Sequence, residues 1–209
     1  MRRLMIAVLA VSGLSAVAAP ALAWGPYTRE GWVVGVAYGP GRAKISGFDS
    51  LATGWLEGPA QSIRIGRMFG PFAKVGFEHQ AWLREQGFQS VKIRAGTQLE
   101  ALGVTAYPAR PGSGWSGLFV TAGGGYAHCR LTLLEPLAPG ESSIGDTHEV
   151  VFKQDEFGWG VFGGMGYEFQ ISRTFAAGVM LSYNHLDIGD EIYDTADFVP
   201  LTASLNWSF

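Results

Sequence analysis

Charged and amide side chains stand at alternating positions within stretches of apolar and small residues. They are Arg64, Lys74, Glu78, Gln80, Lys92, Arg94, Gln98, Glu100 and Glu168. Because every second side chain of a β-strand points to the same face, we expect these residues to share the inner face of a sheet. The four cations and three anions could neutralise one another as a buried polar network. They could also line a narrow path for ions.

Carboxylates also gather near the C-terminus, in a segment without a basic residue. This segment holds Asp187, Asp190, Glu191, Asp194 and Asp197. Oxygen ligands of this kind suit Ca²⁺ or Mg²⁺, but the spacing is not that of an EF-hand loop. Three histidines, His79, His128 and His148, show no metal-ligand spacing. We expect neither a resident metal nor a cofactor.

Eight stretches alternate in the way that predicts half-buried strands. They are approximately Glu30–Gly39, Ala60–Phe69, Phe72–Trp82, Phe88–Tyr107, Gly117–Leu133, Asp155–Gln170, Thr174–Asn184 and a last strand that ends at Phe209. Short connections such as Gly70-Pro71 and Ile171-Ser172-Arg173 alternate with connections that are mostly longer. Such alternation is typical of barrels that present long loops on one side of a membrane.

The fourth stretch is long, and we assign its faces from its apolar residues. Val91, Ile93 and Leu99 are predicted to point outward, which sets Lys92 and Arg94 inward together with Glu78. The pattern weakens beyond Leu102, where a bulge is expected.

The two ends of the chain indicate export and membrane insertion. Residues 1–23 have a basic start, an apolar run and a final Ala-Leu-Ala, which predicts a signal peptide cleaved after Ala23. Residues 24–209 would then form one domain. At the other end, Leu205, Trp207 and Phe209 alternate with polar residues up to the final position. A strand of this kind suits a barrel whose outer face meets lipid.

Composition agrees with a membrane barrel. Hydrophobic residues make up 47% of the chain, yet no stretch after Ala23 is long enough for a membrane helix. Only helices and closed barrels satisfy their backbone in lipid, so a barrel is expected. Five aromatic residues are candidates for girdles at the membrane interfaces: Trp32, Tyr38, Trp159, Tyr167 and Tyr183. The net charge of −3 gives no case for nucleic-acid binding, and the single Cys129 excludes an intramolecular disulfide.

Three segments carry a resemblance to a known group. They are the Gly-rich Gly117–Tyr126, Gly160–Phe169 and the terminal Ser204–Phe209. The chain resembles the small eight-stranded outer-membrane β-barrels of the OmpA/OmpX type. The resemblance implies an all-β, antiparallel up-and-down transmembrane barrel in the bacterial outer membrane, with both termini in the periplasm. It also implies contact with outer-membrane lipid and lipopolysaccharide, and a terminal signal (Leu205, Trp207, Phe209) read by the barrel-assembly machinery.

The resemblance leaves three functions to compare. We expect a non-enzymatic barrel whose extracellular loops serve envelope integrity, adhesion or surface interactions, with an unidentified external ligand. The alternative is a narrow porin-like channel for small solutes or ions. A lipid A-modifying enzyme is the third possibility, since some eight-stranded barrels are lipid A deacylases with a serine two positions after a histidine. Here Asp187 follows His185 at that spacing, and a carboxylate cannot supply the serine nucleophile.

Overall fold

The described part of the chain consists mainly of eight long strands. The computed structural model describes residues 29–46, 54–88, 91–111, 113–136, 148–189 and 194–209. The predicted signal peptide therefore lies outside the described residues. The strands are β1 (Trp32–Ile45), β2 (Leu56–Phe69), β3 (Ala73–Phe88), β4 (Val91–Ala106), β5 (Leu118–Pro136), β6 (His148–Gln170), β7 (Phe175–Asp187) and β8 (Thr195–Ser208).

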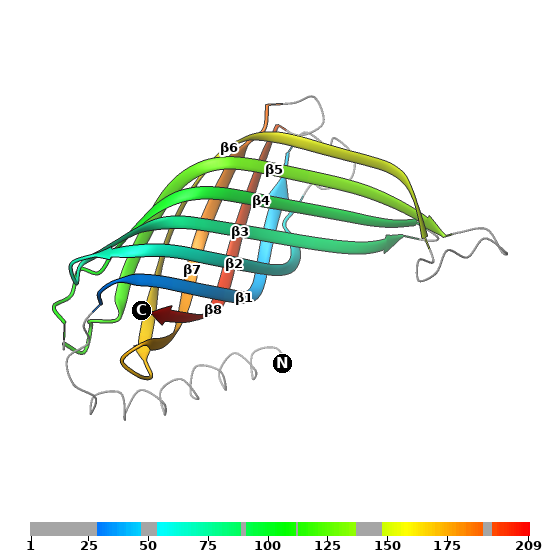
Figure 1. The fold of residues 1–209 in the computed structure, drawn as a ribbon. Coiled ribbons are helices and arrows are strands. Elements are labelled where there is room, and N and C mark those ends of the chain that lie inside the picture. The colour runs from blue at the N-terminus through cyan, green and yellow to red at the C-terminus, as the bar shows by residue number, and fades with distance from the viewer. Residues whose placement is uncertain (1–28, 47–53, 89–90, 112, 137–147, 190–193) are drawn as a thin grey trace.

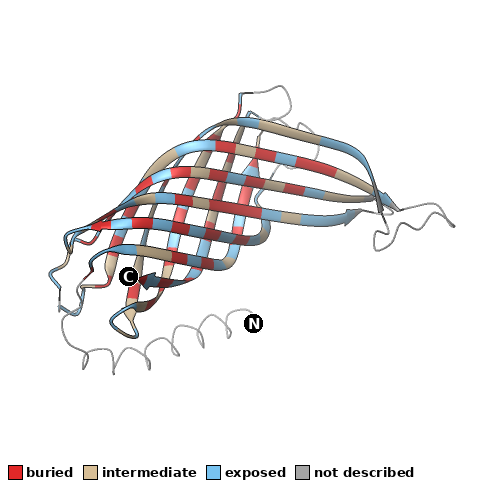
Figure 2. Ribbon diagram, viewed as in Figure 1, coloured by how far each residue is buried: buried red, intermediate tan, exposed pale blue. Residues whose placement is uncertain are grey.

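The strands close into an antiparallel barrel in chain order, and β1 pairs with β8 (Figure 1). This confirms the predicted fold class. Buried and exposed residues alternate along each strand (Figure 2), as expected for a wall with an inner and an outer face. Within the described ranges, no helix has the length and apolar character needed to cross a membrane.

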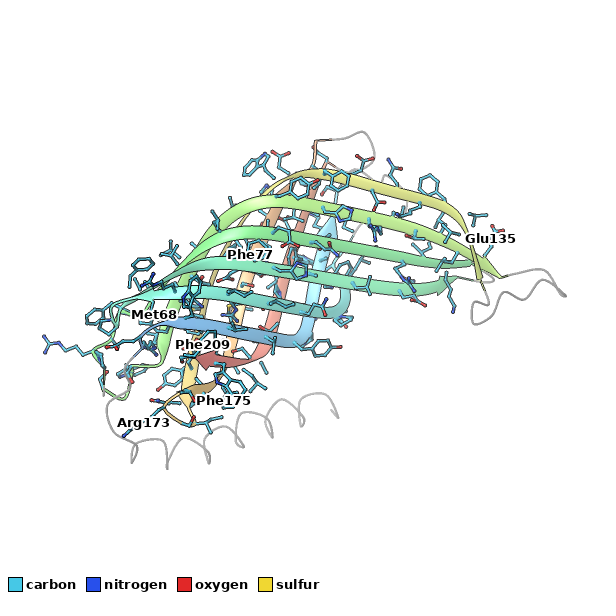
Figure 3. All side chains as sticks on the ribbon, viewed as in Figure 1. Met68, Phe77, Glu135, Arg173, Phe175 and Phe209 are labelled. Atoms are coloured by element: carbon cyan, nitrogen blue, oxygen red, sulfur yellow. The ribbon has the colours of Figure 1, made fainter. Side chains whose placement is uncertain are left out.

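The barrel wall is longer on one side than the sequence pattern predicted. β3 continues to Phe88 and β4 begins at Val91, so the predicted connection Leu83–Gly87 is part of a strand. β5 and β6 contain 19 and 23 residues, against 13 in β7. Strands β3 to β6 therefore project beyond the others on the side opposite the C-terminus, with Glu135 near the tip (Figures 1 and 3).

The predicted faces of the upper half of β4 are wrong. Ala95, Thr97 and Leu99 are buried inside the barrel, whereas Arg94 and Gln98 are exposed outside. In the projecting part of the wall the outer face is polar, so apolar character no longer marks the outward side. The register with both neighbouring strands is continuous through Leu102, and the register shift lies instead between Leu133 and Leu134.

The barrel interior contains two apolar clusters and a set of buried polar side chains. We call the end of the barrel opposite the C-terminus the loop end. An apolar cluster at this end includes Trp82, Leu99, Phe162, Leu186 and Phe198, together with the buried Cys129. At the end that holds the C-terminus, a second cluster consists of Met68, Tyr107, Phe119 and Met180. Buried polar and charged side chains occupy the rest of the interior, and some of them, such as Lys74 and Glu168, pack at the level of the second cluster. Side chains thus fill the interior, as expected for an eight-stranded barrel.

Candidate functional site

Glu168 is the best-connected charge among the buried polar side chains. Both of its carboxylate oxygens accept a hydrogen bond from the Tyr107 hydroxyl at 3.2 Å, and one also accepts from Asn206 Nδ2 at 3.2 Å. Arg29 Nη2 lies 3.9 Å from Glu168 and donates to the carbonyl of Ser116 at 2.7 Å. The guanidinium carbon of Arg29 sits 3.6 Å from the centre of the Tyr107 ring. Four segments of the chain are therefore joined around one carboxylate.

Glu78 and Gln80 connect strands across the interior. Gln80 Nε2 and the Thr121 hydroxyl each donate to Glu78 at 3.4 Å. The amide oxygen of Gln80 accepts from the Ser182 hydroxyl of β7 at 3.2 Å. These bonds link β3 with β5 and β7, so Glu78 and Gln80 help to hold opposite walls together.

Arg64 differs from the other buried charges because its guanidinium is unsatisfied. The residue is 2% exposed, and its three side-chain nitrogens have no hydrogen-bond partner among the described residues. The neighbouring Lys74 interacts electrostatically with Arg64, Glu78, Glu168 and Arg29. Among these five buried groups, three are cations and two are anions. By formal charge, the described interior therefore has one cation more than it has anions.

Four residues predicted to face the interior lie on the outer surface instead. They are Lys92, Arg94, Gln98 and Glu100. Glu85 Oε2 accepts a hydrogen bond from Arg94 at 3.0 Å, and its other oxygen lies 3.9 Å from Lys92. The hypothesis that Lys92, Arg94 and Glu78 form one inner network is therefore wrong. The physical reason is the β4 register, which pairs the inward Gln80 with Leu99 rather than with Glu100.

Glu100 forms a polar pair on the outer wall. Its carboxylate lies 2.5 Å from His79 Nδ1, and the two residues are cross-strand neighbours in β3 and β4. One strand further, Glu100 faces Tyr126. Sequence reasoning placed Glu100 inside and gave His79 no partner, because the pairing depends on the relative register of two strands.

A second outer group surrounds Asp155 on β6. Its carboxylate binds Arg130 at 2.5 Å, Lys153 at 2.8 Å and His128 Nε2 at 3.0 Å. On the same projecting part of the wall, Arg94 faces Thr132, which in turn faces Lys153. We name the four half-exposed cations Lys92, Arg94, Arg130 and Lys153 the outer cationic patch. The sequence pattern did not reveal the patch, because it assigned two members to the interior.

The candidate girdle residues all belong to the outer face. Trp32, Tyr38, Trp159 and Tyr183 are about half exposed or more. The Tyr167 hydroxyl donates to the carbonyl of Gly114 at 2.8 Å. Of the terminal residues, Leu205, Trp207 and Phe209 also point outward, and Phe209 pairs with Trp32 through two backbone hydrogen bonds of 2.8 and 2.9 Å.

The histidine considered for catalysis is held by an acid rather than placed beside a hydroxyl nucleophile. His185 Nδ1 lies 2.8 Å from Asp197 Oδ1, which also accepts a 2.6 Å hydrogen bond from the Tyr183 hydroxyl. Ser182 points into the barrel, on the opposite face of β7. In the ranges that the structure describes, no group of three His, Cys, Asp or Glu side chains could hold a metal. Asp190 and Glu191 lie outside those ranges.

Comparison with known proteins assigns the family. Residues 6–209 match the family described as the outer membrane protein beta-barrel domain. The chain belongs to this family. It is an outer-membrane β-barrel, which agrees with the predicted resemblance. A comparison with curated proteins finds no match.

Solved structures of other outer-membrane barrels share the fold. Ail, the attachment invasion locus protein of Yersinia pestis, was solved with the heparin analogue sucrose octasulfate. It is 13% identical, with 85% of this chain and 99% of Ail covered and a TM-score of 0.53. Neisserial surface protein A is also 13% identical, with 85% and 97% covered and a TM-score of 0.52. At these identities the likeness concerns the fold alone.

Proposed function

We propose that this barrel is a non-enzymatic surface protein that binds anionic groups of the cell envelope through its outer cationic patch. In this proposal residues 1–23 are removed, both termini are periplasmic, and the loops at the far end face the exterior. Its role would be in envelope integrity, adhesion or another surface interaction. The observation that carries the proposal is the position of the patch on the projecting wall.

The height of the patch follows from strand geometry. Arg94 is twelve residues from Ala106, and Arg130 is twelve residues from Leu118, each counted from the end of the barrel that holds the C-terminus. At about 3.3 Å per residue and a tilt of about 40°, twelve residues rise by roughly 30 Å. The apolar band of such barrels is about 25 Å tall. The patch would therefore lie just outside the hydrocarbon, level with the phosphates of lipopolysaccharide.

The charges in the patch are suited to anions. Four cations lie near two acids, Glu85 and Asp155, so the described patch keeps a positive excess. Arginine binds phosphate and sulfate groups through paired N–H donors. The sucrose octasulfate in the Ail structure supports sulfated or phosphorylated sugar as the ligand class. Tyr126 and Trp159 lie lower on the same strands and would mark the edge of the apolar band, as a girdle does.

Packing of the interior favours this proposal over the channel alternative. An ion on the barrel axis would have to cross the cluster around Phe119 and the cluster around Phe162, as well as the buried charges. Buried apolar side chains exclude water, and an ion without its hydration shell is costly to place there.

Anion binding can be tested with the purified, refolded protein. The double variant Arg94→Gln and Arg130→Gln should elute from immobilised heparin at lower salt than the native protein. Its binding to lipopolysaccharide vesicles should also weaken by about tenfold, the equivalent of roughly 1.4 kcal/mol. The matched control changes two exposed arginines at the opposite end, Arg67 and Arg173, to Gln. Equal losses in both variants, or no loss in either, would reject the patch as the binding surface.

A further inference from the structure

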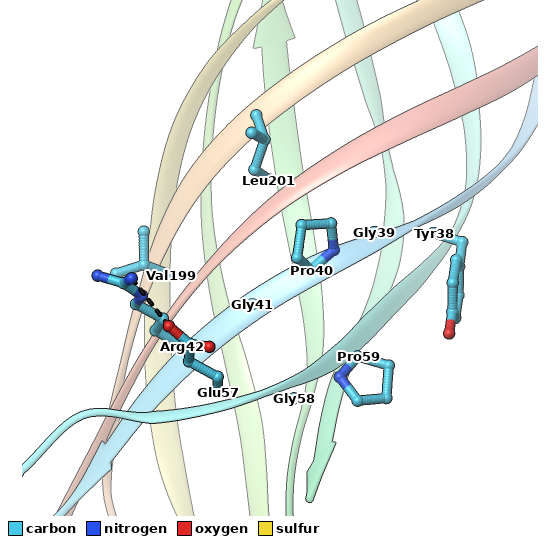
Figure 4. A pocket seen from close by; sticks show the side chains of 10 residues that line it. All are labelled: Tyr38, Gly39, Pro40, Gly41, Arg42, Glu57, Gly58, Pro59, Val199 and Leu201. Atoms are coloured by element: carbon cyan, nitrogen blue, oxygen red, sulfur yellow. Dashed lines mark hydrogen bonds and ion pairs between the residues drawn. The ribbon is translucent and has the colours of Figure 1, made fainter. Parts of the chain in front are cut away.

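The outer wall has a groove where β8, β1 and β2 meet, on the loop side of Tyr38 (Figure 4). Its volume is about 860 Å³. The lining residues are Tyr38, Gly39, Pro40, Gly41, Arg42, Glu57, Gly58, Pro59, Val199 and Leu201. Most of these side chains are apolar or absent, and the one charged pair is Arg42 with Glu57, 2.9 Å apart. The volume falls within the range of about 300–1,000 Å³ typical of small-molecule sites.

Glycine and proline pairs make the wall thin at this place. Pro40 faces Pro59 and Gly41 faces Gly58 in the β1–β2 register. Proline has no backbone N–H, and within sheets it is found mostly at edges and bulges. The closed barrel nevertheless carries these two prolines at one height. Because rigid rings and missing side chains replace larger residues, the outer surface is hollowed here.

The backbone pairing is also interrupted around the groove. Between β1 and β8, pairing runs to Tyr38↔Ala203 and resumes at Gly41↔Pro200. Between β7 and β8, it runs to Leu181↔Leu201 and resumes at Asn184↔Phe198. Pro40 and Pro200 lie within or at the edges of these gaps, and neither can donate a ladder hydrogen bond. The groove therefore lies where the regular backbone pairing of neighbouring strands is broken.

Trp82 supports the groove from inside the barrel. This residue is 1% exposed, and a Cβ added at Gly41 or Gly58 would come within 3.0 Å of its indole ring. Its indole nitrogen has no hydrogen-bond partner among the described residues. Larger residues at Gly41 or Gly58 would therefore clash with the tryptophan. The glycines let Trp82 pack directly against the wall behind the groove.

The groove spans the upper part of the apolar band. Pro40 is eight residues from Trp32 along β1, and Arg42 is ten residues from it. With the same rise and tilt, these distances are roughly 20 and 25 Å above the level of Trp32. The apolar part of the groove would then face hydrocarbon of the outer leaflet, while Arg42 and Glu57 would meet the headgroup region.

We propose that this groove binds an acyl chain of lipopolysaccharide. The inference rests on the proposed orientation, in which the loop end faces the outside, because lipopolysaccharide forms the outer leaflet. An extended chain would lie between Tyr38, the two prolines and Leu201. The Arg42–Glu57 pair would offer both a donor and an acceptor to the polar part of the lipid. The site would therefore retain one lipid against the wall, in addition to the lipids that surround any barrel.

Lipid retention measured by native mass spectrometry tests the proposal. Full-length mature protein is refolded in membranes that contain both lipopolysaccharide and phospholipid. Leu201→Trp fills the groove, whereas Leu205→Trp is the matched control, on the same strand and similarly exposed at 49% against 53%. We expect Leu201→Trp to retain at least about fivefold less lipopolysaccharide than the control, close to 1 kcal/mol. Heat-dependent gel mobility reports whether both variants are folded.

Each of the other outcomes would contradict one part of the two proposals. Equal lipopolysaccharide retention by the two folded variants would overturn the groove as a binding site. Loss of phospholipid rather than lipopolysaccharide in Leu201→Trp would overturn the assignment of the occupant. A third outcome is that lipopolysaccharide retention depends on Leu201 while heparin binding is unaltered in the Arg94 and Arg130 variant. That result would reject the proposed patch function and still support the groove as a lipid site.

Discussion

The hydroxyl of Tyr107 lies 3.2 Å from both carboxylate oxygens of Glu168, inside the barrel wall. This contact joins the end of β4 to β6. Tyr107 also belongs to the apolar cluster at the end of the barrel that holds the C-terminus, so the buried charges pack directly against that cluster. The charged and apolar side chains at this end therefore depend on one another.

Replacing Glu168 should destabilise the barrel strongly. Glu168→Ala leaves Arg29 with one ionic partner fewer and removes the carboxylate that accepts hydrogen bonds from Tyr107 and Asn206. Loss of one partner of a buried charged group costs about 3–5 kcal/mol. Urea unfolding of the protein in lipid vesicles measures this change. The exposed Glu30→Ala serves as a control and should change stability by less than about 0.5 kcal/mol.

Removing Arg64 should have the opposite effect. Its guanidinium is buried without a hydrogen-bond partner among the described residues, so Arg64→Met removes a buried charge whose N–H donors are unsatisfied. Replacement of a whole buried ion pair by apolar residues is often neutral or stabilising by about 1–4 kcal/mol, and we expect the same direction for this single charge because its donors are unsatisfied. The same unfolding experiment applies. A loss of more than about 2 kcal/mol would mean that Arg64 makes an essential interaction in the interior.

The His79–Glu100 pair gives a prediction for the outer wall. His79→Ala removes the partner of Glu100 and leaves a carboxylate on the outer surface, six residues above Ala106 on β4. Glu100 faces Tyr126 at the edge of the apolar band, where a charge on the lipid face costs about 0–1 kcal/mol. The double variant His79→Ala with Glu100→Ala should recover part of that loss. If the double variant is less stable than His79→Ala, Glu100 has a favourable role of its own.

The filled interior predicts no stable conductance. Planar-bilayer recordings on the refolded native protein should show no sustained single-channel current, because the two apolar clusters block the barrel interior. Phe119→Gly with Phe162→Gly opens space in both clusters and serves as the comparison. A steady current through the native protein would support the channel alternative instead.

The C-terminal strand provides a test of the expected assembly signal. Deleting Phe209 removes the outward aromatic residue and its two backbone hydrogen bonds to Trp32. We expect much less folded barrel in the outer membrane of expressing cells, measured by heat-dependent gel mobility of membrane fractions. Trp207→Phe keeps an aromatic residue at the neighbouring outward position and should assemble normally. Normal assembly of the deleted protein would contradict the proposed signal.

Sequence alternation predicted the eight strands, and the apolar composition without a membrane helix predicted that they close into a barrel. It also identified the inward faces of β2 and β3, where Arg64, Lys74, Glu78 and Gln80 lie. On these strands, the outward residues are largely apolar, as those of a lipid-facing wall should be. On these strands, apolar residues therefore mark the outer face and polar residues mark the inner face.

This relation between polarity and face reverses where the wall extends beyond the apolar band. In the upper half of β4, Leu99 packs inside and Arg94 points outward. Outside hydrocarbon, the outward face can be polar while the inner face remains in an apolar cluster. Nothing local in the sequence marks this change of surroundings, so Lys92, Arg94, Gln98 and Glu100 were assigned to the wrong side. The Glu85 and Asp155 ion pairs were missed for the same reason.

Because Cys129 is fully buried, the reactivity of its thiol distinguishes folded from unassembled protein. Its sulfur lies within the loop-end cluster with no exposed surface. A thiol-reactive dye added from either side would leave the assembled protein unlabelled and would mark chains that have not yet closed. Since the sequence contains no other cysteine, the fraction labelled would count unassembled molecules directly. New cysteines placed on the loops could likewise be labelled without removing the native one.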